Sequence, residues 1–167
     1  MGRGWIWCVA VLVVTKLVTI PLQGQTAFAS NSDVSSIARM VGGGTEFTST
    51  SIEVNHGLDL HCNAAIAPNY LQVIWHDNVF VMTDLGSVSC STDPAIQSGA
   101  SFNTINGMGI GTLNGQSGAG IEFTFTDAGQ PGVFNDTARI VIRGAWGFTT
   151  LEVSGKIVAG THIAMDQ

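Results

Sequence analysis

The chain has 167 residues, of which 45% are hydrophobic and 11% charged, and its formal net charge at pH 7 is −6. A nucleic-acid partner is disfavoured because phosphate binding needs clustered Lys and Arg, and the whole chain holds only six of them. The same deficit argues against an anionic membrane surface as the partner.

The N-terminal segment, residues 1–29, is typical of a secretory signal peptide. Arg3 supplies the positive end, residues 5–14 form an apolar run that stops before Lys16, and residues 27–29 read Ala-Phe-Ala, a small-x-small cleavage site. The apolar run is shorter than the roughly 18 to 20 residues that a membrane-spanning helix needs. We therefore expect a secreted or periplasmic protein without a membrane anchor. Its remaining length suits one domain, with four basic residues against twelve acidic ones.

Residues 30–44, SNSDVSSIARMVGGG, are small, polar and Gly-rich, and we expect a flexible leader there. Residues 45–167 alternate apolar and polar residues between turn signals, with no sustained helical period, which predicts a single all-β domain. Two cysteines remain after the signal, Cys62 and Cys90. An even count in an exported chain predicts that they form a disulfide.

The stretch NHGLDLHCN, residues 55–63, places two histidines and a cysteine close together in the sequence. Successive side chains of a strand point to opposite faces, so His61 lies opposite to Cys62, whereas His56 shares the parity of Cys62. A zinc or copper site made from all three side chains is therefore disfavoured. The cysteine is better explained as the partner of Cys90.

The segment LQVIWHDNVFVMTDL, residues 71–85, predicts the clearest hairpin, with Asp77-Asn78 as a two-residue turn. This turn places Trp75 opposite Phe80 and Val73 opposite Met82. One face of the hairpin is then wholly apolar and is expected in the core: Leu71, Val73, Trp75, Phe80 and Met82. The other face is only half polar, which is compatible with partial cover.

Three later segments also alternate in the manner of strands: GIEFTFTD, TARIVIR and TTLEVSGKIVAG. With them the number of expected strands reaches about eight or nine. Short connections between so many strands predict an antiparallel sandwich or jelly roll, with a small closed barrel as the alternative.

The segment GMGIGTLNG, residues 107–115, lacks both the glycine spacing and the following helix of a dinucleotide-binding loop. Its alternate glycines, Gly107, Gly109 and Gly111, are expected on one face of a strand, where a neighbouring chain segment packs closely.

The loop DAGQPGVFND, residues 127–136, begins and ends with a carboxylate, so Asp127 and Asp136 are candidate calcium ligands. Calcium needs six to eight oxygen ligands, and the favoured interpretation is a solvated loop whose two carboxylates accept hydrogen bonds from nearby amides. No nucleophile elbow, zinc-protease motif or catalytic Cys-His arrangement occurs, so no catalytic residue is assigned. His61 with Asp59 is the first pair to test for acid-base catalysis.

The pieces HGLDLHC, PNYLQVIW, GMGIGTLNGQSG, FTFTDAGQPG and LEVSGKIVAGTHIA lie in order between residue 42 and about residue 164. Their order and spacing resemble a family of exported bacterial domains of uncharacterised function, found as small secreted proteins and appended to repeat-rich cell-surface proteins. The resemblance implies a β-sandwich with a Cys62–Cys90 bridge and brings no catalytic residues. In similar chains a Glu stands where this chain has Gln130, so a cation site in this loop would lack one potential ligand. A looser similarity of GIGTLNGQSGAG to hairpins of secreted eight-stranded barrels, such as dirigent-like proteins, keeps the barrel open.

The favoured function is a non-catalytic secreted β-sandwich that serves as a surface, matrix or protein-interaction module, with an unknown protein or glycan as partner. One alternative is a calcium-dependent carbohydrate-binding module, with Asp127 and Asp136 holding the ion and Trp146 or Tyr70 stacking on the sugar. Another is a small barrel enzyme or ligand carrier with a pocket of histidine and carboxylate. No cofactor is expected, with calcium as the one remaining candidate, and the oligomeric state is left open.

Overall fold

The computed structural model describes residues 37–166, and the predicted signal peptide lies outside the described residues. The strands are β1 (Arg39–Phe47), β2 (Glu53–His61), β3 (Tyr70–Trp75), β4 (Asn78–Ser91), β5 (Thr104–Leu113), β6 (Gln116–Thr126), β7 (Thr137–Arg143), β8 (Thr149–Lys156) and β9 (Ala159–Met165). The described part of the chain contains no helix that could cross a membrane. Nine strands confirm the predicted all-β fold.

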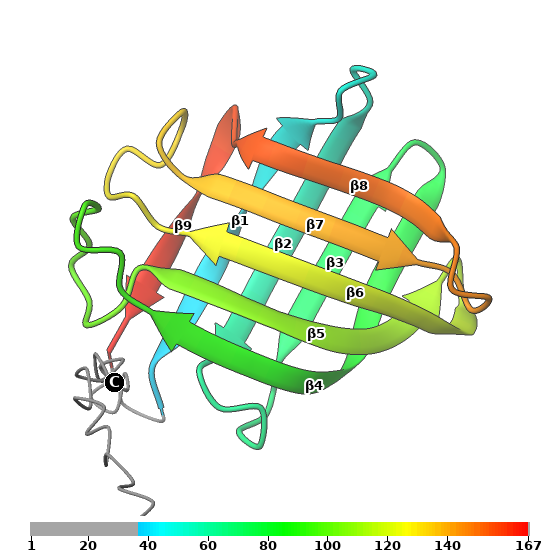
Figure 1. The fold of residues 1–167 in the computed structure, drawn as a ribbon, viewed down its shortest axis with the longest axis horizontal. Coiled ribbons are helices and arrows are strands. Elements are labelled where there is room, and N and C mark those ends of the chain that lie inside the picture. Colours follow the sequence, from blue (N-terminus) through cyan, green and yellow to red (C-terminus); the bar gives the residue numbers. More distant parts are fainter. Residues whose placement is uncertain (1–36, 167) are drawn as a thin grey trace, which may run out of the picture. The chain divides into compact units, whose positions relative to one another are not determined.

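All nine strands belong to one antiparallel sheet with the order β8-β7-β6-β5-β4-β3-β2-β1-β9. The sheet is strongly curled into a half-barrel, so that β4 to β8 pass over and across β9, β1, β2 and β3 (Figure 1). Its two edge strands, β8 and β9, are consecutive in the chain. The amide of Val158, between them, donates to the Thr45 carbonyl of β1 at 2.7 Å.

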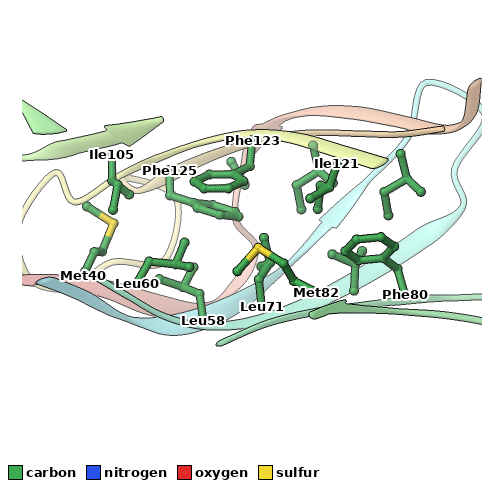
Figure 2. Packing of buried hydrophobic residues seen from close by; sticks show 14 of the residues in the cluster. Met40, Leu58, Leu60, Leu71, Phe80, Met82, Ile105, Ile121, Phe123 and Phe125 are labelled. Carbon is green, nitrogen blue, oxygen red and sulfur yellow. The ribbon is translucent and has the colours of Figure 1, made fainter. Parts of the chain in front are cut away.

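The hydrophobic core lies between the two halves of the curled sheet, because the inward side chains of both halves are apolar. Figure 2 shows side chains of β2 and β3 facing those of β6 across this core. The largest apolar side chains that are fully buried are Phe80, Phe102, Phe125, Met40, Leu60, Leu71, Ile105, Ile140, Ile142 and Ile157. The described interior is therefore filled by bulky aliphatic and aromatic groups.

The disulfide between Cys62 and Cys90 is confirmed, with the two Cα atoms 5.5 Å apart. Cys62 follows β2 directly, and Cys90 lies near the end of β4. The bridge thus joins the two halves of the sheet at one margin and closes a loop of sequence separation 28.

The β3–β4 hairpin has the predicted buried face, since all five of its apolar side chains are at most 6% exposed. The predicted turn is wrong by one residue: Trp75 pairs with Asn78 rather than Phe80, and Val73 pairs with Phe80 rather than Met82. The loop residues are His76 and Asp77, and His76 adopts a positive φ of 46°. Moving a turn by one residue shifts the pairing by two positions, which leaves every side chain on its predicted face.

The outward face of the same hairpin is not covered by the described residues. Ile74 is 40% exposed and Tyr70 44%.

The structure also bears on the expectations for two glycine-rich segments, one in β5 and one in β1. In β5 the three glycines pack closely against a neighbouring strand as predicted: a Cβ on Gly109 would come within 2.7 Å of the Asp84 carbonyl of β4, and one on Gly107 or Gly111 would strike β4 backbone as well. In β1 the expectation of a flexible leader reaching residue 44 is wrong, because residues 39–44 are paired with both β2 and β9. The sheet therefore begins six residues before the predicted domain boundary.

Candidate functional site

A chain of buried hydrogen bonds links four strands of the sheet. Glu46 of β1 contacts Nδ1 of His56 of β2 at 3.0 Å, and Nε2 of His56 contacts Nε2 of His162 of β9 at 2.8 Å. Nδ1 of His162 lies 3.1 Å from the Thr126 carbonyl at the end of β6. A carbonyl only accepts, so His162 carries its proton on Nδ1 and accepts through Nε2 from His56. The contact between His56 Nδ1 and the Glu46 carboxyl group completes the chain of hydrogen bonds.

Glycines of β1 lie opposite both buried histidines in the sheet. Gly44 pairs with His56 across one ladder, and Gly42 pairs with His162 across the other. A Cβ on Gly44 would come within 2.8 Å of the Ile157 side chain, and Gly42 has a φ of 133°, where side chains are disfavoured. The Gly-Gly-Gly run of β1 is thus a packing feature beside the buried histidines rather than a flexible tether.

The pKa of His162 is lowered from its ordinary value of 6.5 to about 4, chiefly by burial and also by the nearby His56. The hydrogen bond to Thr126 and the carboxylates of Asp136 and Asp127 oppose this shift without cancelling it. His162 is therefore neutral at neutral pH, in agreement with its role as an acceptor from His56.

The buried triad is poorly placed for catalysis. Glu46, His56 and His162 are 1%, 7% and 0% exposed, so a substrate would reach them only if the sheet opened. One Glu46 oxygen, Oε1, has no hydrogen-bond partner among the described residues. The arrangement instead connects β1, β2, β9 and the end of β6 by directional bonds. The contact between His56 and His162 could not be predicted from sequence spacing, because the two residues are 106 positions apart.

Asp127 and Asp136 lie in the loop between β6 and β7 and are 5% and 0% exposed. In each carboxylate, one oxygen accepts a hydrogen bond from a backbone amide of the loop at 2.8 Å. The other oxygen accepts a hydrogen bond from a backbone amide of the edge strand β9. The donor to Asp127 is Ala164, at 2.8 Å, and the donor to Asp136 is His162, at 2.7 Å. The two carboxylates thus occupy the hydrogen-bonding positions that another strand would fill beside β9.

These contacts bear on the calcium interpretation. All four carboxylate oxygens already accept hydrogen bonds from backbone amides. Among residues 37–166, no group of three or more His, Cys, Asp or Glu side chains is placed so that it could hold a metal ion. Trp146 does not lie beside the carboxylates: it follows the end of β7, whereas Asp136 precedes its start. Tyr70 lies on the outer face of β3, where its hydroxyl donates to Gln72 at 2.9 Å. A calcium site at Asp127 and Asp136 is thus an untested alternative whose oxygens already accept hydrogen bonds from the backbone.

His61 and Asp59, the first pair to test for acid-base catalysis, do not form a hydrogen bond with each other in the described structure. Asp59 is paired with Arg39 at 3.3 Å, and Nδ1 of His61 is buried with no hydrogen-bond partner among the described residues. His76 is exposed in the β3–β4 turn. His61 itself is buried, at 8% exposed, although strand parity sets it opposite to Leu60.

A shallow groove of about 420 Å³ crosses the outer face of β4, β5, β6 and β7. A neighbouring hollow of about 290 Å³ shares two of its residues, Ser87 and Met108. Two register shifts in β4, between Met82 and Asp84 and between Leu85 and Ser87, lie beside it. Such bulges bend a strand locally. The groove is lined chiefly by small polar and long side chains: Ser87, Ser89, Asn106, Met108, Glu122, Thr124 and Arg139.

A second outer feature is the hairpin connection between β7 and β8, residues 144–148, with the sequence Gly-Ala-Trp-Gly-Phe. Trp146 is 90% exposed and Phe148 is 77% exposed, the two highest values among the large apolar side chains described. The amide of Gly144 donates to the Phe148 carbonyl at 3.0 Å, and the amide of Gly147 donates to the Gly144 carbonyl at 2.8 Å. These bonds make the connection a closed turn, so the two aromatic rings are presented by an ordered backbone.

No protein-family profile, curated protein or solved structure matches this chain. The function of the chain therefore has to be inferred from its own structure.

Proposed function

We propose that this protein is a non-catalytic, extracytoplasmic interaction module that docks on a surface or matrix component through the aromatic hairpin of residues 144–148. The observation that carries the proposal is the exposure of Trp146 and Phe148 at one turn. Fully burying one large apolar side chain contributes roughly 1.5 to 3 kcal/mol. Trp is also the side chain most enriched among residues that dominate binding energy.

The shape of the hairpin supports the same proposal. Its two internal hydrogen bonds hold the backbone, and a Cβ on Gly118 in the adjacent β6 would lie only 3.3 Å from the Ala145 side chain. A turn that is already ordered loses little conformational entropy when it docks, so more of the apolar burial appears as affinity. Loops held on a rigid β scaffold are common positions for recognition.

The alternative functions find less support in the geometry. A ligand carrier or barrel enzyme needs interior space, but the described interior is filled by large side chains such as Phe80, Phe102 and Phe125. A calcium-dependent sugar site needs an aromatic ring beside Asp127 and Asp136, but Trp146 lies beyond the opposite end of β7.

The proposal is tested by sedimentation of the oxidised protein with four purified matrices: peptidoglycan sacculi, chitin, cellulose and collagen fibres. We expect binding to at least one matrix, and the double variant W146A/F148A should weaken it by about tenfold or more, as expected when hot-spot side chains are truncated. The matched control is Y70A, which removes an exposed aromatic ring elsewhere on the surface. Failure of the parent to bind any of the four matrices, or equal binding by parent and double variant, would refute the proposal.

A further inference from the structure

We propose that the groove across the outer face of β4 to β7 is a second binding site, for a neutral carbohydrate chain. Its volume of about 420 Å³ lies in the range of small-ligand sites, roughly 300 to 1,000 Å³. The groove is on the opposite side of the sheet from the buried histidines and is separate from the aromatic hairpin. Its occupant can be inferred from its hydrogen-bonding groups, its charges and its apolar residues.

The polar side chains of the groove have unused hydrogen-bonding capacity. Ser87, Ser89, Asn106 and Thr124 all line it, and none of these side chains forms a hydrogen bond with another described residue. Other polar side chains of the described sheet do pair with one another. Examples are Thr45 with Asn55, Tyr70 with Gln72, and Asn78 with Asn114. The groove therefore concentrates hydroxyl and amide groups that are left for solvent or a ligand.

The charges in and around the groove disfavour an anionic ligand. Glu122 is ion-paired with Arg143, and Arg139 lies 4.0 Å from Glu152 of β8. The adjoining hollow presents the carboxylate of Asp84. A ligand with many negative charges would meet this carboxylate and a chain whose formal net charge is −6.

The apolar part of the groove is a patch rather than a deep pocket. Met108 is 54% exposed on β5 and lines both hollows, and Ile110 next to it on the same face is 57% exposed. Flexible Met side chains adapt to irregular surfaces. An apolar patch beside free hydroxyl and amide groups matches a pyranose ring, which offers a C–H face and a rim of hydroxyl groups.

The position of the groove disfavours an added peptide strand. Strands β4, β5, β6 and β7 are each paired on both sides, so the sheet offers no free backbone edge beneath the groove. Peptides that bind sheets by strand addition require such an edge. A ligand in the groove must be held by side chains alone, as the hydroxyl and amide groups would hold a sugar.

The test is a titration of the isotope-labelled, oxidised protein followed by amide NMR. The probes are three soluble neutral hexasaccharides (cellohexaose, maltohexaose and N-acetylchitohexaose), a polyuronate oligomer, and a neutral Gly-Ser peptide of similar length. We expect at least one neutral hexasaccharide to shift the amides of residues 87–89 and 106–108 at millimolar concentrations. The surface variants N106A and M108A should each weaken that binding by about tenfold, and S154A, an exposed change on β8, should leave it unchanged.

The outcomes separate this site from the aromatic hairpin. If W146A/F148A still binds the hexasaccharide, the groove is supported as the sugar site. This conclusion does not depend on whether the variant binds insoluble matrices. The groove proposal is overturned by an absence of binding of all three neutral hexasaccharides, or by stronger binding of the polyuronate or the peptide. Loss of sugar binding in W146A/F148A but not in N106A or M108A would also overturn it, since the sugar would then bind at the hairpin.

Discussion

The neutral state of buried His162 predicts that the protein loses stability in mild acid. Because the pKa of His162 falls from 6.5 in the unfolded chain to about 4 in the fold, the unfolded chain takes up this proton first as the pH falls. The stabilising contribution is complete above pH 6.5 and is lost as the pH decreases through 4. A shift of this size corresponds to about 3 kcal/mol of unfolding free energy between neutral pH and pH 4, at 1.36 kcal/mol per pKa unit.

The assay is urea unfolding of the parent and of H162Q at a series of pH values from about 7 down to 4. Glutamine does not titrate, so the free energy of unfolding of the parent should fall by about 3 kcal/mol more than that of H162Q over this range. The carboxylates titrate in both proteins, and their contribution therefore cancels in the comparison. H76N, at the exposed histidine of the β3–β4 turn, serves as the control and should follow the parent. Parallel curves for the parent and H162Q would show that the fold does not hold His162 neutral.

Further predictions concern packing, the disulfide and the loop carboxylates. G111A should cost about 1 to 3 kcal/mol of stability because the added Cβ strikes the backbone of β4, whereas G155A, which meets nothing within 4 Å, should cost little; urea unfolding distinguishes them. Replacing Cys62 and Cys90 by Ala, and thus opening a loop of separation 28, should cost about 3 to 4 kcal/mol in the same assay. D136N turns one amide-accepting oxygen into a donor, so it should cost about 1 to 3 kcal/mol and accelerate hydrogen exchange in β9. Millimolar calcium should not raise the melting temperature above that in chelator; a rise of several degrees would restore the calcium interpretation.

The alternation of side chains was sufficient to predict β3, β4, β6, β7 and β8 and the faces that they bury, because a half-buried sheet requires that pattern, but it did not predict residues 39–44 of β1. The exact turn of the β3–β4 hairpin was not predictable in the same way. Asp77-Asn78 has the composition of a two-residue turn, but the Asn78 side chain accepts a hydrogen bond from Asn114 of the next hairpin at 3.0 Å. This contact joins residues 36 positions apart, and a local reading of turn propensity does not contain it.

The leader and the buried triad were missed for a related reason. Glycines at residues 42–44 look like a flexible segment when read alone, but in the fold they lie opposite two histidine rings. Strand parity could assign His56 to the core side, since it shares the parity of Leu58 and Leu60. Parity could not identify His162 as its partner, because that contact arises only when the sheet curls and β9 returns beside β1.

The polar groups of the interior and the proposed binding surfaces are connected by the way in which the sheet is held curled. Apolar contacts favour closing the two halves but do not fix how β9 lies against the end of β6, since such contacts are not directional. Hydrogen bonds from His162 to Thr126, and from the β9 amides to Asp127 and Asp136, do fix this position. The disulfide restrains the curl at a separate point, between β2 and β4. With the curl fixed at these points, the backbone that carries the outer groove and the aromatic hairpin does not have to rearrange on binding. The free-energy cost of binding is then small, so that even weak surface contacts produce a measurable affinity.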